Sequence, residues 1–212
     1  MDRVPTPQLQ SRQQDPDALV RFGAWLFRQR TWLPVPLALV ILLLPAQDVS
    51  RFVVWVGLAV VAGGEALRLS AVRRIGVVSR TRIDRSGPLV TSGPFAWVRN
   101  PLYLGNVALW TGFALGAGLP WLVPVILILL GIEYHAIVRW EETLLESRLG
   151  ESYRSYAARV PRWIPRLTRG AAESPGAFSW PDTFFSERGT LLAIVVGCVL
   201  VWMKHRALGS GL

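Results

Sequence analysis

Two stretches of the chain combine charged and aromatic side chains with turn-forming residues in patterns that suit ligand binding. The first, residues 92–105, reads SGPFAWVRNPLYLG. Proline fixes its own backbone angle and disfavours helix in the residue before it, so Arg99 and Asn100 should stand directly ahead of a helix that starts at Pro101. Arg99 and the amide groups at this helix start would together attract an anion. We therefore predict a ligand-binding corner here.

The second stretch, residues 139–165, reads RWEETLLESRLGESYRSYAARVPRWIP. It leaves an apolar segment as a charged helix, which Gly150 should end. Adjacent Glu141 and Glu142 would repel each other unless a cation or hydrogen-bond donors lay nearby. The alternative is a solvated helix face on which these carboxylates pair with arginines of the same helix. Both interpretations stay open at this point.

The rest of the chain is dominated by apolar blocks, and 51% of its 212 residues are hydrophobic. Five blocks are nearly free of charge: 32–46, 52–69, 102–119, 121–138 and 190–203. A membrane-spanning helix needs roughly 20 residues, which the middle three blocks approach, whereas the first and last are shorter and need their flanking aromatic residues. We therefore predict an all-α integral membrane protein, a helical bundle with about five transmembrane helices.

The formal net charge is +9, carried mainly by arginine. These arginines lie between the apolar blocks, within residues 1–30, 68–100 and 139–188, rather than along one soluble face. That distribution argues against nucleic acid as a partner. By the positive-inside rule these segments face the cytoplasm. We expect a bacterial-type inner or cytoplasmic membrane, with the candidate site on its cytoplasmic side.

A few polar side chains interrupt the apolar blocks. Glu65 is a candidate functional group because intramembrane carboxylates are costly, but it could also simply pair with Arg68. His135 suits a hydrogen-bonded structural role. The chain has one other histidine, His205, and one cysteine, Cys198, without the spacing of a zinc site. We therefore predict no bound metal.

The chain divides into three predicted parts. Residues 1–30 should form a polar tail followed by a short amphipathic helix at the membrane interface. Residues 31–165 should form the membrane core. Residues 166–212 begin with a segment rich in Gly, Pro and Ser, 166–188, which we expect to be an interfacial loop capping the site, and end in a last transmembrane helix.

Taken together, GPFAWVRNPLYLG and EETLLESRLGESYRSYAARVPRWIP resemble the isoprenylcysteine carboxyl methyltransferase and phospholipid methyltransferase family of integral membrane enzymes. The resemblance covers roughly residues 52–165 and combines Gly-Pro-aromatic, Arg-x-Pro-x-Tyr-x-Gly, a glutamate pair and Gly-x-x-Tyr-x-x-Tyr. It implies a methyltransferase that binds S-adenosylmethionine in a pocket at the cytoplasmic face. The acceptor would be lipophilic or lipid-linked and would enter from the bilayer.

The resemblance also implies which side chains form the cofactor pocket: Arg99, Asn100, Pro101, Tyr103 and Gly105 would line it, Glu141 or Glu142 would contact the adenosyl or amino groups, and Tyr153 and Tyr156 would pack the cap over it. Arg99 and Glu142 are the leading candidates for the catalytic centre. Asn100 departs from the pattern, which usually reads Arg-His-Pro. Asparagine can hydrogen bond but cannot accept a proton at neutral pH. A carboxylate or thiolate acceptor needs no base, whereas an amine or hydroxyl would need another residue, such as Glu133, Glu142 or His135.

Two alternatives to a methyltransferase remain. A sterol-reductase-like membrane oxidoreductase would use NADPH, and the absence of a GxGxxG motif argues only weakly against it. A non-catalytic membrane scaffold with the same fold would bind no nucleoside cofactor, and the asparagine in place of histidine is compatible with it.

Overall fold

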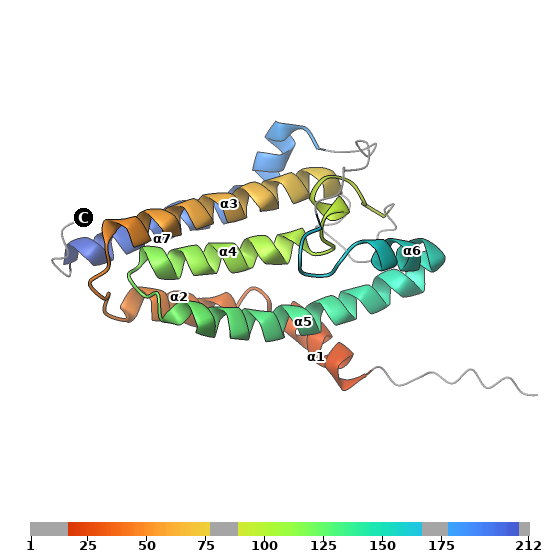
Figure 1. Ribbon diagram of the computed structural model, residues 1–212, viewed down its shortest axis with the longest axis horizontal. Helices are drawn as coiled ribbons and strands as arrows, with labels where there is room; N and C mark the ends of the chain where they lie inside the picture. Colours follow the sequence, from red (N-terminus) through yellow and green to blue (C-terminus); the bar gives the residue numbers. More distant parts are fainter. Residues whose placement is uncertain (1–16, 77–88, 167–177, 208–212) are drawn as a thin grey trace, which may run out of the picture.

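The computed structural model describes residues 17–76, 89–166 and 178–207, and all the regular structure within these ranges is helical. The elements are α1 (Ala18–Gln29), α2 (Pro34–Leu43), α3 (Arg51–Ile75), the 3-10 helix η2 (Gly93–Ala96), α4 (Pro101–Gly116), α5 (Leu122–Leu149), α6 (Glu151–Arg159) and α7 (Trp180–Ala207). The all-α prediction is therefore confirmed. Figure 1 shows α3, α4 and α5 running side by side in alternating directions, with η2 and α6 at one end of the bundle.

Three described helices, α3, α5 and α7, are long and apolar enough to cross a membrane. The bent pair of α1 and α2 makes a fourth if it is one broken span. The predicted number of five is not confirmed, because α4 has only 16 residues and is about 24 Å long, less than the roughly 30 Å of a bilayer's hydrocarbon core. Its neighbour α5 has 28 residues, so it extends well beyond the first residue of α4. This difference in length leaves room for other segments over the start of α4.

Helices α3 and α4 approach each other at glycines. A Cβ atom on Gly112 would lie 2.6 Å from the carbonyl oxygen of Gly57, and one on Gly64 would lie 2.9 Å from that of Gly105. Gly63, next to Gly64 on α3, has open space where its Cβ atom would lie. The two backbones are therefore held at a distance that no larger residue at the contact positions would permit.

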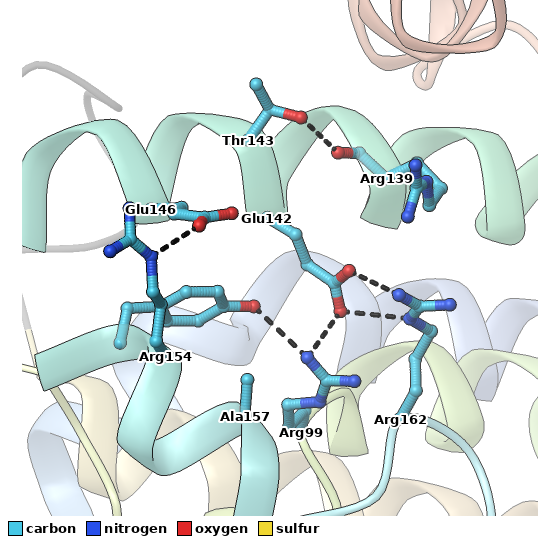
Figure 2. Close-up of a pocket in the computed structure, with 9 residues that line it drawn as sticks. Arg99, Arg139, Glu142, Thr143, Glu146, Arg154, Ala157 and Arg162 are labelled. Atoms are coloured by element: carbon cyan, nitrogen blue, oxygen red, sulfur yellow. Dashed lines mark hydrogen bonds and ion pairs between the residues drawn. The ribbon is translucent and has the colours of Figure 1, made fainter. Parts of the chain in front are cut away.

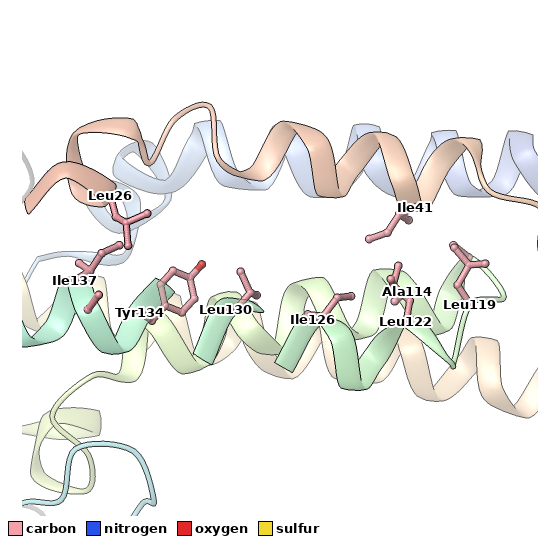
Figure 3. Packing of buried hydrophobic residues seen from close by; sticks show 11 residues of the cluster. Leu26, Ile41, Ala114, Leu119, Leu122, Ile126, Leu130, Tyr134 and Ile137 are labelled. Atoms are coloured by element: carbon pink, nitrogen blue, oxygen red, sulfur yellow. The ribbon is translucent and has the colours of Figure 1, made fainter. Parts of the chain in front are cut away.

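The main apolar core lies between α5, α4 and the α1–α2 pair (Figure 3). Its buried members include Leu26, Ile41, Ala114, Leu119, Leu122, Ile126, Leu130, Tyr134 and Ile137. The amphipathic helix α1 packs closely on α5, since Gly23 meets the backbone of Ala136 with no room for a Cβ atom. The core thus fixes α5, which carries the glutamate pair.

The last helix, α7, begins earlier than expected. Residues 180–188, which we assigned to the capping loop, are helical because Ser179 acts as a start signal: its hydroxyl accepts a hydrogen bond from the Asp182 amide, and its carbonyl accepts one from the Thr183 hydroxyl. The rest of that predicted loop, 167–177, lies outside the described residues. At the other end, Lys204 donates to the carbonyl of Ile41.

Candidate functional site

Backbone hydrogen bonds join the two motif-bearing stretches over the start of α4. The amide of Arg99 donates to the carbonyl of Pro161 at 2.9 Å, and the amide of Arg166 donates to the carbonyl of Trp97 at the same distance. Asn100 reinforces the contact, because its side-chain amide donates to the carbonyl of Arg162 at 3.1 Å. Segments about sixty residues apart in sequence therefore form one local structure.

Glu142 on α5 lies between two guanidinium groups in this structure (Figure 2). Arg162 donates two hydrogen bonds to the Glu142 carboxylate, from Nε to Oε1 at 2.9 Å and from Nη2 to Oε2 at 2.6 Å. Arg99 Nη1 lies 2.9 Å from the same Oε1. Both arginines lie outside α5, the helix that carries Glu142, and the Glu142 side chain is only 14% exposed. The solvated-face interpretation is thus wrong for Glu142, and the alternative with nearby cations is confirmed.

A cavity of about 280 Å³ opens beside this carboxylate. Its lining consists mainly of charged side chains from α5, α6 and the two loops: Arg99, Arg139, Glu142, Thr143, Glu146, Tyr153, Arg154, Ala157 and Arg162. Four guanidinium groups against two carboxylates leave an excess of positive charge. The cavity therefore favours a ligand that carries at least one anionic group.

The side chain of Arg99 shows how the cavity could hold such a group. The Nε atom of Arg99 is buried and has no hydrogen-bond partner, although Nη1 of the same guanidinium is bound to Glu142. The start of α4, which follows Arg99 but does not line the cavity, has no side-chain cap, and the side chain of Asn100 bonds elsewhere. A buried donor without a partner is costly, so a ligand that satisfied it would gain from binding.

Tyr153 on α6 completes the wall next to Glu142. Its hydroxyl lies 3.5 Å from Arg99 Nη1. Burial, and then the negative charge of Glu142, raise the pKa of Tyr153 above its usual value, so this side chain stays a neutral phenol. The hydrogen bond to Glu142 raises the pKa of Arg162. Tyr153 is thus a neutral member of a site whose guanidinium groups stay charged.

Glu141 and Glu142 contact different partners. Residues next to each other on a helix point about 100° apart, and Glu141 accepts a 3.0 Å hydrogen bond from the hydroxyl of Tyr103 on α4. The ring of Tyr103 packs against that of Tyr134, with centroids 4.7 Å apart. Glu141 and Tyr103 do not line the cavity. They form a second polar pair beside it.

The other predicted residues have supporting positions. Pro101 is buried at the first turn of α4. Gly105 faces α3, where a Cβ atom would collide with the side chain of Arg68. Tyr156 is buried and donates a 2.8 Å hydrogen bond to the carbonyl of Phe95 in η2, so it attaches α6 to the first stretch. None of these three lines the cavity.

Sequence reasoning did not single out Arg162, which contributes two of the three bonds to Glu142. The sequence offered a signal for Arg162, because it lies between Pro161 and Pro165 in RVPRWIP. This segment belongs to the second motif-bearing stretch, residues 139–165. Among the described residues there is no group of three or more side chains that could hold a metal ion.

Comparison with known proteins supports the resemblance. The phospholipid methyltransferase family matches residues 52–152. A nickel-cobalt-cadmium resistance protein of Alcaligenes xylosoxydans xylosoxydans is 32% identical over 90 residues, 42% of each chain. The human protein-S-isoprenylcysteine O-methyltransferase is 33% identical over 123 residues, which cover 51% of this chain and 40% of that enzyme.

An uncharacterized protein of Haemophilus influenzae is 47% identical over 69 residues, 32% of this chain and 84% of that protein. The chain spans about two fifths of the length of the resistance protein and of the human enzyme. No solved structure matches the chain.

Proposed function

Because this chain belongs to the phospholipid methyltransferase family, we propose that it is an integral membrane enzyme that transfers a methyl group from S-adenosylmethionine to a lipophilic or lipid-linked acceptor. The observation that carries the proposal is the position of Arg99. It stands at the start of α4, is bound to Glu142 and has a buried Nε–H group without a partner beside a cavity rich in guanidinium groups.

The residues of the cavity fit the proposed cofactor. S-adenosylmethionine supplies an electrophilic methyl group on a sulfonium, and it carries a carboxylate and an ammonium group. Arg99 suits the carboxylate. Glu142 and Glu146 offer negative charge to the ammonium group from the same cavity wall. Glu142 also orients the guanidinium groups of Arg99 and Arg162, which fixes the site before a ligand arrives.

Asn100 acts in this proposal as a structural residue, because its side-chain amide holds the loop that contains Arg162. Glu142 is tied to two arginines, so it is a poor candidate for a general base. An acceptor that is already an anion, such as a carboxylate or thiolate, needs no such base. Methyl transfer to it requires alignment of the reacting atoms and exclusion of water.

The direct test is calorimetric titration of the detergent-purified chain with S-adenosylhomocysteine. We expect saturable binding by the wild type and, in Arg99→Ala and Glu142→Ala, a loss of affinity of roughly tenfold or more, the effect of losing one charged hydrogen bond. Arg159→Ala is the matched control, since Arg159 is exposed on α6 outside the cavity and should bind normally.

Other results would contradict the proposal. Folded wild-type chain that binds NADPH instead would favour the oxidoreductase alternative, and binding of neither compound would favour a scaffold. If binding is found, methyl transfer to a prenylated cysteine carboxylate and to phosphatidylethanolamine should be compared. The argument from Asn100 predicts that the carboxylate is the better acceptor.

A further inference from the structure

A second cluster of charged side chains lies inside the bundle, away from the cavity. Arg68 on α3 is its centre, and its partners come from three helices: Glu65 on α3, Asn106 on α4, and Glu187 and Thr190 on α7. We call this group the Arg68 cluster. The side chains of Glu65, Arg68 and Glu187 are 9%, 10% and 0% exposed. Such a buried arrangement is costly to build unless its geometry is well defined.

The Arg68 cluster attaches α7 to the rest of the bundle. Arg68 Nη2 lies 2.7 Å from Glu187 Oε2 and 3.2 Å from the hydroxyl of Thr190. Glu65 is a partner from the same helix, with its Oε2 3.2 Å from Arg68 Nε. Only 6% of the most apolar 18-residue window of α7 is buried, so polar contacts have a large part in holding this helix.

From Arg68 a series of contacts leads to the Tyr103–Glu141 pair beside the cavity. Arg68 Nη1 donates to Asn106 Oδ1 on α4, and Asn106 lies one helical turn after Tyr103 on the same helix. The ring of Tyr134 packs on that of Tyr103, whose hydroxyl binds Glu141. These contacts connect α3 to α4 through Asn106, and α4 to α5 through Tyr103.

We propose that Glu187 is a positioning residue for the candidate methyltransferase site. By holding Arg68 against Asn106, Glu187 fixes the first turns of α4, and so the Tyr103–Glu141 pair and the ring of Tyr134 that packs on Tyr103. This extends the functional unit to α7, which lies beyond the residues that match the family and contributes nothing to the lining of the cavity. The activity part of the test below rests on the proposed function, and the structural part does not.

Two substitutions separate positioning from stability. Glu187→Gln and Glu65→Gln each remove one carboxylate charge, and each leaves Arg68 with one carboxylate partner. We therefore expect both variants to fold and to have similar melting midpoints in detergent. Only Glu187→Gln breaks the ion pair between α7 and Arg68, so a difference between the two variants reports on that contact.

The chain has four tyrosines: Tyr103 and Tyr134 belong to these contacts, whereas Tyr153 and Tyr156 on α6 lie outside them and serve as internal controls. In chain labelled with 3-fluorotyrosine, four ¹⁹F resonances can be assigned with Tyr→Phe variants. We expect Glu187→Gln to shift the resonances of Tyr134 and Tyr103 and to leave those of the α6 tyrosines in place. Glu65→Gln should cause smaller shifts. Unmoved Tyr134 and Tyr103 resonances in Glu187→Gln, or equal shifts in both variants, would overturn the proposal.

Steady-state kinetics give the second readout. Glu187→Gln should lower kcat about 10- to 100-fold, the range for a small misplacement caused from a distance. The KM for S-adenosylmethionine should stay within about twofold, because Arg99, Glu142 and Arg162 are untouched. Glu65→Gln should keep near-normal kcat. An unchanged kcat in Glu187→Gln would overturn the positioning role.

The outcomes can be told apart. If the wild type transfers no methyl group but Glu187→Gln still shifts the two resonances, the proposed function fails and the coupling stands. Should Glu187→Gln not fold, Thr190→Val removes a weaker α7 contact of Arg68 at nearly constant size. It should shift the Tyr134 resonance in the same samples, and an unmoved resonance there would count against the proposal.

Discussion

The two charged clusters have opposite composition. At the cavity, one carboxylate, Glu142, lies between two guanidinium groups, whereas in the Arg68 cluster one guanidinium lies between two carboxylates. The first is built by loops and helix ends and opens to a cavity. The second is built by three helices and is almost fully buried. The comparison teaches that an open cluster with excess guanidinium suits ligand binding, while a closed one suits the connection of helices.

The largest effect should come from the centre of the closed cluster. Arg68→Met leaves the buried carboxylates of Glu65 and Glu187 without the guanidinium between them, and loss of one partner from a buried ion pair costs about 3–5 kcal/mol of unfolding free energy. We expect a clearly lower melting midpoint and a lower yield of folded chain in detergent. A midpoint within a few degrees of wild type would show that the cluster is not a structural connection.

Arg162 should have the next largest effect, on binding rather than on folding. Its two bonds to Glu142 depend on the planar geometry of a guanidinium, which lysine lacks. We expect Arg162→Lys to weaken S-adenosylhomocysteine binding roughly tenfold, with Arg162→Ala weaker still. Equal affinity in Arg162→Lys and wild type would mean that the two hydrogen bonds from Arg162 to Glu142 do not organise the site.

Sequence reasoning located the open cluster better than the closed one. Arg99, Glu142 and Tyr153 meet at the cavity because the patterns that contain them are local, with prolines and a glycine that fix where helices start and end. Arg68 was recognised only as a partner for Glu65. Its contacts with Asn106 and Glu187 join residues 38 and 119 positions apart, and no periodicity or turn signal specifies such a distance.

The helices themselves were predictable to different degrees. The apolar blocks predicted α3 and α5, since long runs of apolar residues leave few alternatives. The start of α7 was missed because Ser179 caps a segment that reads as a loop by composition. The short length of α4 follows from Pro101 at one end and a Gly-rich turn at the other, yet the importance of this length appears only once α5 lies alongside.

Tyr156 tests how firmly α6 is held over the open cluster. Tyr156→Phe removes the 2.8 Å hydrogen bond to the carbonyl of Phe95 but keeps the ring, so we expect a loss of about 1 kcal/mol in stability and a small loss of ligand affinity. The control is Tyr153→Phe, whose hydroxyl contact is longer at 3.5 Å and should matter less for stability. A larger loss of stability in Tyr153→Phe would reverse the roles that we give to the two tyrosines.

The smallest effect should come from the rim of the same cavity. Arg154 lies 2.7 Å from Glu146, a distance as short as that of the buried pair between Arg68 and Glu187, but its side chain is 60% exposed. Water and salt screen an exposed pair and its side chains lose entropy on pairing, so Arg154→Ala should leave the melting midpoint unchanged and shift S-adenosylhomocysteine affinity by less than about twofold. Thermal melting measures the midpoint, and titrations at low and high salt measure the affinity and its screening. If Arg154→Ala weakened binding as much as Arg99→Ala, burial would not be what separates the ligand-holding arginines from the rest, and the ligand would have to sit at the rim rather than against Glu142.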